Sequence, residues 1–171
     1  MATQKLQAIA GVSASEETEI RMKYPSVAST FIGKAIGSLC DCIPVKIWGV
    51  KVSYMIFALP LAPLGVLLYA LLKLAGRKYI LTNRSVQVWS SLLPTCLKSI
   101  DLTTIDQIDI YQDDGQQFFN AANLVLLDKK GDSILHMPGL QSADIFQAII
   151  LKARDARVET EAAMATIAAR G

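Results

Sequence analysis

Histidine and cysteine, the side chains that most often bind metals or act as nucleophiles, are scarce in this chain. It has one histidine and three cysteines among 171 residues. Cys40 and Cys42 are too close in sequence for a typical structural bridge, and Cys96 stands apart, so no disulfide framework is expected. Together with His136, the cysteines match no zinc-ligand spacing. We therefore expect free thiols in a reducing compartment and no metal site.

Catalytic motifs are also missing. The sequence contains no serine–histidine–aspartate order, nucleophile elbow, phosphate-binding glycine loop or zinc-binding helix. His136 lies in a short apolar stretch, where a structural role is usual, and Cys96 has no evident base beside it. We expect no enzymatic activity and no cofactor, with a thiol- or metal-dependent enzyme as the weakest alternative.

A strong excess of charge of one sign is absent as well. The formal net charge is +2, which is too small to indicate nucleic-acid binding. Basic residues downstream of Tyr79 are dispersed, which disfavours a pocket for acidic lipid headgroups. The aspartates between Asp101 and Asp114 lack the spacing of a calcium loop, and solvated turns and strand faces explain them better.

What the chain does have is a long apolar run. Residues 52–72 carry no charged side chain, with Lys51 before them and Lys73 after them. A helix of that length would measure about 31 Å, the thickness of a hydrocarbon core. Helices that are apolar on every face are rare in soluble domains. The run therefore predicts a segment embedded in a membrane.

Prolines near the middle of this run leave its form open. Pro60, Pro63 and Gly65 predict a kink, which membrane helices tolerate, so a kinked span is the favoured interpretation. A shallow re-entrant hairpin that turns within 59–63 is one alternative. A helix buried in the core of a soluble domain is the other.

Residues 27–43 form a weaker apolar segment, which Pro44 ends. Its spacing predicts an amphipathic helix at the membrane interface, with a poor first transmembrane helix as the alternative. Lys34 and Asp41 are seven residues apart, so they share one face, where a partner would shield them from lipid. The apolar positions are Phe31, Ile32, Ala35, Ile36, Leu39 and Ile43. We expect a membrane-associated region over 25–75, as one helix or a helical hairpin, after a polar tail (1–24) that is flexible or forms a short helix.

Basic residues around the apolar run predict its orientation. Four of them follow the run within fifteen positions and two precede it. The positive-inside rule then places the C-terminal region in the cytoplasm. We expect Trp48, Lys73, Arg77 and Lys78 to contact the membrane surface.

From residue 79 the periodicity changes from helical to alternating. Residues that favour strands recur between turn signals, and a helix with an apolar stripe follows Ser142, a candidate N-cap. The expected strands are 79–83, 86–89, 99–103, 105–110, 124–127 and 134–137. This pattern predicts an α+β fold in which a curved antiparallel sheet or small barrel is closed by one helix. Residues 158–171 extend that helix or fray.

Several short motifs resemble the bacterial pleckstrin-homology-like (PH-like) domain of the bPH2 type. They are YILTNR at 79–84 followed by VQV at 86–88, IDLTTI at 100–105, and MPGL at 137–140 before the last helix. Glu19 followed by YPS at 24–26 is also similar, and the resemblance covers roughly 16–157.

The resemblance implies a PH-like roll over 79–157. Its seven strands would be capped by the C-terminal helix and tethered to the cytoplasmic side of a bacterial inner membrane, in many members by two transmembrane helices. Two features depart from the family. The first apolar segment is unusually polar, and Asn-Ala-Ala-Asn stands at 120–123 where glycines are common.

Exposed aromatic and leucine residues are the candidates for protein contacts. Phe118 and Phe119 adjoin in an expected loop, although strand alternation would bury one of them. Trp89 and Leu92 flank another loop and would meet lipid or a partner, with ordinary packing as the alternative. We expect a non-catalytic, membrane-anchored adaptor or accessory subunit that binds another membrane or membrane-associated protein. A lipid- or ligand-binding sensor at the inner membrane surface is the alternative.

Overall fold

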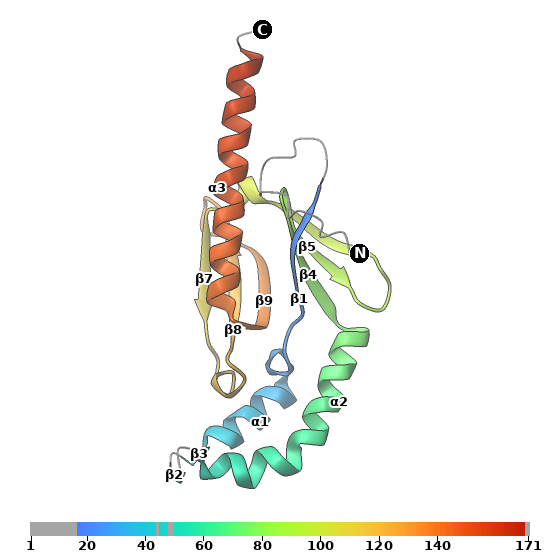
Figure 1. The fold of residues 1–171 in the computed structure, drawn as a ribbon, viewed down its shortest axis with the longest axis vertical. Helices are drawn as coiled ribbons and strands as arrows, with labels where there is room; N and C mark the ends of the chain where they lie inside the picture. The colour runs from blue at the N-terminus through green and yellow to red at the C-terminus, as the bar shows by residue number, and fades with distance from the viewer. Residues whose placement is uncertain (1–16, 44, 48–49, 170–171) are drawn as a thin grey trace, which may run out of the picture.

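Two antiparallel sheets and a long helix form one part of the protein, and two helices that fold back on each other form the other (Figure 1). This computed structural model describes residues 17–43, 45–47 and 50–169. We call the sheets with the long helix the β-module, and the two folded-back helices the helical hairpin. The mixed α+β class expected from the sequence is confirmed at this level.

The first sheet has four strands in the order β1-β4-β5-β6. Their bounds are Glu19–Lys23, Arg77–Thr82, Ser85–Ser90 and Cys96–Asp101. Strand β1 corrects the expectation from the sequence, which assigned these residues to a polar tail or a short helix. It pairs with β4 through Met22 opposite Ile80 and Lys23 opposite Tyr79. Five residues with a distant partner carry too little periodicity to be recognised as a strand.

The second sheet has three strands in the order β7-β8-β9. Their bounds are Gln107–Tyr111, Ala121–Leu127 and Ser133–Gln141. A hairpin turn joins β8 to β9 as expected, because the Asp128 carboxylate accepts the N–H groups of Lys130 and Asp132. A short 3-10 turn, η3 (Leu102–Thr104), separates β6 from β7. Residues 102 and 103, which the sequence assigned to the end of a strand, therefore belong to a turn between the two sheets.

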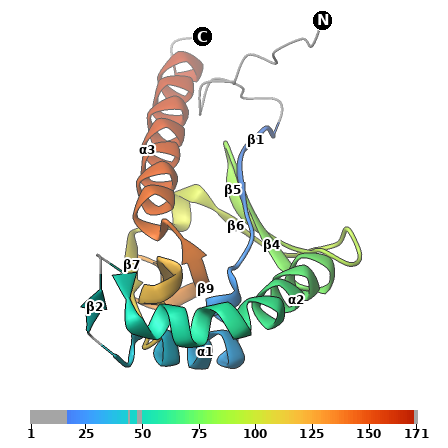
Figure 2. The ribbon, with the colours of Figure 1, turned by 60° about the horizontal axis from the view of Figure 1, so that its bottom comes forward.

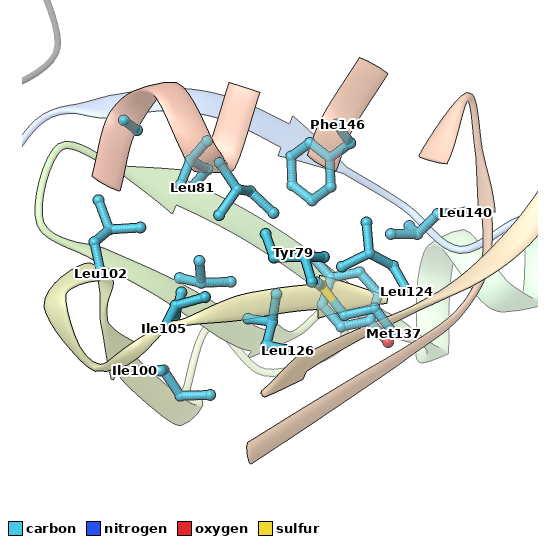
Figure 3. Close-up of a cluster of buried hydrophobic side chains, with 14 of the residues drawn as sticks. Tyr79, Leu81, Ile100, Leu102, Ile105, Leu124, Leu126, Met137, Leu140 and Phe146 are labelled. Atoms are coloured by element: carbon cyan, nitrogen blue, oxygen red, sulfur yellow. The ribbon is translucent and has the colours of Figure 1, made fainter. Parts of the chain in front are cut away.

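The long helix α3 (Ala143–Ala168) covers the core between the sheets. Phe146 and Ile150 are fully buried among side chains from both sheets, whereas Ile145 is exposed (Figure 3). Ser142 stands at the N-cap position, but its backbone is left-handed (φ 51°) and its side chain makes no capping hydrogen bond. The helix continues to Ala168, so residues 158–168 extend it, and its C-terminal part runs past the sheets (Figure 1).

The helical hairpin starts with the 3-10 turn η1 (Val27–Ser29) and helix α1 (Phe31–Asp41). A two-residue ladder of β2 (Lys46–Ile47) and β3 (Val50–Lys51) follows. The chain then returns through η2 (Tyr54–Ala58), which is π-helical, and α2 (Leu59–Ala75). Both views show α2 running beside α1 and bending on its way to β4 (Figures 1 and 2). The prolines predicted this bend.

The apolar residues of α2 do not enter the core. Among the described residues one helix, Tyr54–Ala75, is long and apolar enough to cross a membrane, and none of its most apolar window is buried. The same holds for one face of α1, where Phe31, Ile32 and Leu39 are exposed while Ile36 and Cys40 are buried. The alternative of a buried soluble core helix is therefore wrong.

Candidate functional site

The helical hairpin rests on the β-module through glycines. An added Cβ at Gly37 of α1 would lie 1.9 Å from the carbonyl oxygen of Gly115, in the loop before β8. Gly115 itself has φ +79°, a conformation that side chains rarely adopt. Only the absence of side chains at both positions allows the two backbones to meet.

Polar groups reinforce this contact. Lys34 of α1 forms an ion pair with Asp113, whose carboxylate also accepts a 2.9 Å hydrogen bond from Asn123. The Asn123 side-chain oxygen in turn accepts from Gln116 (2.7 Å) and from the Gly139 N–H (3.0 Å). We call Lys34, Asp113, Gln116 and Asn123 the polar junction. The Lys34 ammonium is the main cause that holds the pKa of Asp113 below its usual value.

Both charges of α1 therefore find partners within the chain. Lys34 reaches the β-module, and Asp41 pairs with Lys51 and accepts a 3.3 Å hydrogen bond from the Tyr54 hydroxyl. The sequence predicted that this face would meet a partner. That partner is the protein itself.

Phe118 and Phe119 pack against the hairpin. They lie in the 3-10 turn η4 (Gln117–Phe119) and are half-buried, so neither is the freely exposed anchor that the sequence suggested. The Phe118 ring meets Tyr54 edge to face, with 5.0 Å between centroids, and Phe119 meets Phe118 at 4.8 Å. These contacts tie the turn to the start of the returning helix.

An apolar groove of about 420 Å³ lies between α1, α2 and η4. It is lined by Val27, Ile36, Ala58, Leu61, Ala62, Gly65, Val66, Tyr69, Phe118 and Phe119. A second cavity of about 270 Å³ shares Val27, Tyr69 and Phe119 with it and adds Lys23 and Tyr24. Burial lowers the pKa of Lys23, whose ammonium donates to the Gln141 carbonyl (3.1 Å). The two cavities are therefore neighbours, the first lined mainly by apolar side chains and the second also by polar ones.

The predicted surface residues gather where α2 meets the β-module. Lys73 and Arg77 are exposed, and the Lys78 ammonium lies 5.9 Å from the centre of the Trp89 ring. Leu92 is exposed in the loop between β5 and β6. Trp48 lies outside the described residues.

The candidate metal ligands do not assemble. Among the residues that the structure describes, no three histidine, cysteine, aspartate or glutamate side chains are placed to hold one ion. Cys40 is buried, Cys42 and Cys96 are exposed, and all three are free. His136 lies on the outer side of β9, with its Nε2 atom 2.9 Å from the Tyr111 hydroxyl.

Comparisons with models of known protein families, with curated proteins and with solved structures found no match to this chain. The functional interpretation is therefore based on the arrangement of the residues described above. It combines an outward apolar surface, a charged rim and a groove, all at one end of the β-module.

Sequence reasoning missed the polar junction and the role of Lys23. Asn123 and Gln116 are buried, and no pattern of spacing distinguishes a buried amide from a solvated one. One charge pattern was available, and three of its basic residues, Lys73, Arg77 and Lys78, lie at this end of the molecule. No acidic residue occurs between Asp41 and Asp101, whereas seven basic residues do.

Proposed function

We propose that the protein is a non-catalytic, membrane-anchored module that holds a protein-interaction surface at a bilayer. The helical hairpin is the anchor, and the β-module carries the surface. The observation that supports this most strongly is the apolar helix Tyr54–Ala75, which lies outside the core although leucine and alanine dominate it. In water such a surface would drive aggregation, whereas in lipid it needs no cover.

The pairing of β1 with β4 bears on how the hairpin meets the membrane. Lys23 lies opposite Tyr79 in one sheet, so the chain leaves the β-module and returns to it at the same place. A single crossing would put these two strands on opposite sides of the bilayer, so it is incompatible with this pairing. A hairpin, which enters and leaves the membrane on one side, fits the pairing.

The dimensions favour a re-entrant hairpin over two full spans. Helix α1 has 11 residues and measures about 16 Å, roughly half of the hydrocarbon core. The bend in α2 shortens its reach as well (Figure 1). We propose that the hairpin dips into one leaflet and leaves Lys73, Arg77 and Lys78 at the anionic cytoplasmic surface.

The β-module is proposed to be a PH-like roll on the cytoplasmic side of a bacterial inner membrane. Its support is the two sheets of four and three strands with a C-terminal helix across the core, together with the short motifs in the sequence. Strand β6 ends the four-stranded sheet, and its residues Cys96–Ser99 are exposed. A sheet edge of this kind accepts an extended segment of a partner protein.

The anchor is tested by alkaline extraction of membranes that contain the full chain. We expect the native chain to stay in the membrane and a Leu67→Asp, Leu71→Asp variant to be released. Both side chains are exposed on α2, and an aspartate at membrane depth costs about 2.5–3.5 kcal/mol. The matched control, Ile145→Asp with Val158→Asp, places the same change on exposed positions of α3 and should stay. Release of the native chain itself would contradict the proposal.

The interaction surface is tested separately by photo-crosslinking in cells. A crosslinking side chain at Leu97, exposed on β6, should capture one membrane or membrane-associated protein, and the same side chain at Ile145 should not. Equal capture at both positions would count against a partner at the β6 edge.

A lipid-binding sensor is the second candidate, and the groove favours it. The groove suits an acyl chain, and Lys23 in the neighbouring cavity suits a phosphate. Native mass spectrometry of the full chain in mild detergent would then detect a bound phospholipid. Its occupancy should fall in a Gly65→Leu variant, which fills the groove, and hold in a Leu71→Ile control. A chain that carries no lipid would remove this candidate.

A further inference from the structure

We propose that the loop between β5 and β6 is a second membrane contact that inserts into the headgroup region beside the end of α2. We call Leu92 and Leu93 the leucine tip. The inference rests on the proposed anchor. It adds that a part of the β-module, separate from the helical hairpin, also contacts the lipid surface.

The leucine tip is the only pair of adjacent leucines in the described part of the two sheets and their loops in which both side chains are exposed. Leu92 is 69% exposed and Leu93 is 64% exposed, and Leu97 on the following strand is exposed too. A soluble hairpin loop normally carries polar and glycine residues, which solvate the turn. Two adjacent leucines at this place have no structural role in the fold and point to an apolar neighbour.

Hydrogen bonds hold the leucine tip next to the end of the anchor. The Ser91 N–H donates to the carbonyl oxygen of Gly76, the residue that follows α2 (2.9 Å). Arg77 also lies opposite Ser90 in the sheet. Both views place this loop beside the end of α2, on the side away from the end of α3 (Figures 1 and 2). A bilayer that surrounds α2 therefore meets the leucine tip at the depth where α2 leaves it.

The residues around the leucine tip match an anionic lipid surface. Lys78 lies opposite Trp89, and its ammonium sits over the indole ring. Indole rings and basic side chains favour the headgroup level, and leucine favours the layer just below it. No acidic residue occurs between Asp41 and Asp101, so nothing on this stretch repels anionic lipid. Basic residues at the end of an apolar helix are the arrangement that an anionic lipid surface favours.

Tryptophan fluorescence of the full chain tests the depth of the leucine tip. Trp48→Phe and Trp89→Phe remove both native tryptophans. Single probes are then introduced by Leu93→Trp, by Leu67→Trp on α2 and by Ile145→Trp on α3, all at exposed positions where the fold tolerates a larger ring. The chain is reconstituted in vesicles of phosphatidylethanolamine and phosphatidylglycerol that contain brominated lipids.

We expect the Leu93→Trp probe to be quenched most by bromines near the headgroup and to emit at shorter wavelength than the Ile145→Trp probe. The Leu67→Trp probe should be quenched most by bromines deeper in the acyl chains. The Ile145→Trp probe should be quenched by aqueous acrylamide alone.

Two outcomes would overturn the inference, and they separate it from the proposed function. If lipid quenches the Leu67→Trp probe while acrylamide alone quenches the Leu93→Trp probe, the anchor stands and the leucine tip lies in water. If lipid quenches neither probe, the anchor fails and the second contact fails with it.

Discussion

Leucine, isoleucine and valine side chains form most of the buried core of the β-module, whereas on α2 of the helical hairpin no side chain is buried. Leu81, Leu124 and Leu126 are completely buried between the sheets and α3 (Figure 3). Leu59 and Leu67 of α2 face away from the protein. One chain thus contains two opposite patterns of burial within 171 residues.

The difference is the one that the proposed membrane anchor requires of the two regions. Hydrophobic burial drives the β-module to fold, since each buried side chain leaves water. Burial of apolar side chains stabilises the hairpin much less. Close glycine contacts, an ion pair and buried amides hold it to the β-module. In the proposed anchor, its exposed apolar residues would contact lipid. Substitutions that affect one region and spare the other test this contrast. They are ordered from the largest expected loss of stability to the smallest.

Phe146→Ala should have the largest effect, and it should fall on the β-module. Phe146 is fully buried against both sheets, and removing such a ring costs about 3–5 kcal/mol. The adjacent change Ile145→Ala, on the exposed face of α3, should alter stability by less than about 0.5 kcal/mol. Equilibrium unfolding in mild detergent, followed by circular dichroism, gives both values. Equal losses for the two variants would contradict the assigned core.

Gly37→Ala should loosen the hairpin without unfolding the β-module. The added methyl would lie 1.9 Å from the Gly115 carbonyl oxygen, so the backbones must separate at a cost of about 1–3 kcal/mol. Hydrogen exchange measured by mass spectrometry should become faster in α1 and unchanged in β8. Gly65→Ala is the control, because nothing lies within 4 Å of its added Cβ. Unaltered exchange in α1 would show that the glycine contact does not hold the hairpin.

The sequence predicted the local elements well, because each is encoded by neighbours. Alternation and short apolar runs indicated strands that overlap β4 to β9, with shorter or shifted bounds, and the apolar run with its prolines indicated a bent helix. It could not predict what depends on contacts far apart in the chain. Strand β1 shows its identity only through β4, more than fifty residues later. The site shows the same limit, because Phe118 is read as an exposed anchor until Tyr54 is placed against it.

Acid should weaken the hairpin contact before it affects the core. The pKa of Asp113 is lowered by Lys34 from its usual 3.8, so the ion pair stabilises the folded state above about pH 4. This contribution is lost as pH falls through the lowered value. The pair is partly exposed, so we expect only about 0.2–1 kcal/mol.

Asp113→Asn should therefore flatten the pH dependence of stability below pH 4, and Asp114→Asn, on the exposed neighbour, should not. Thermal unfolding between pH 3 and pH 7 measures this. An identical acid slope in the native chain and the Asp113→Asn variant would exclude a role for this carboxylate.

Asn120→Gly should have the smallest effect, and it tests the turn that joins the two regions. Asn120 has φ 48° and ends the turn that carries Phe118 and Phe119. Asparagine and glycine both adopt this conformation, so stability should change by less than about 0.5 kcal/mol. Asn120→Ala should cost about 1 kcal/mol, since alanine disfavours the left-handed region. Asparagine already adopts the left-handed backbone conformation at position 120. A large increase in the free energy of unfolding on Asn120→Gly would therefore show that the turn is strained. The two phenylalanines would then be held against Tyr54 at a cost, and the contact between the β-module and the hairpin would be weaker than its geometry indicates.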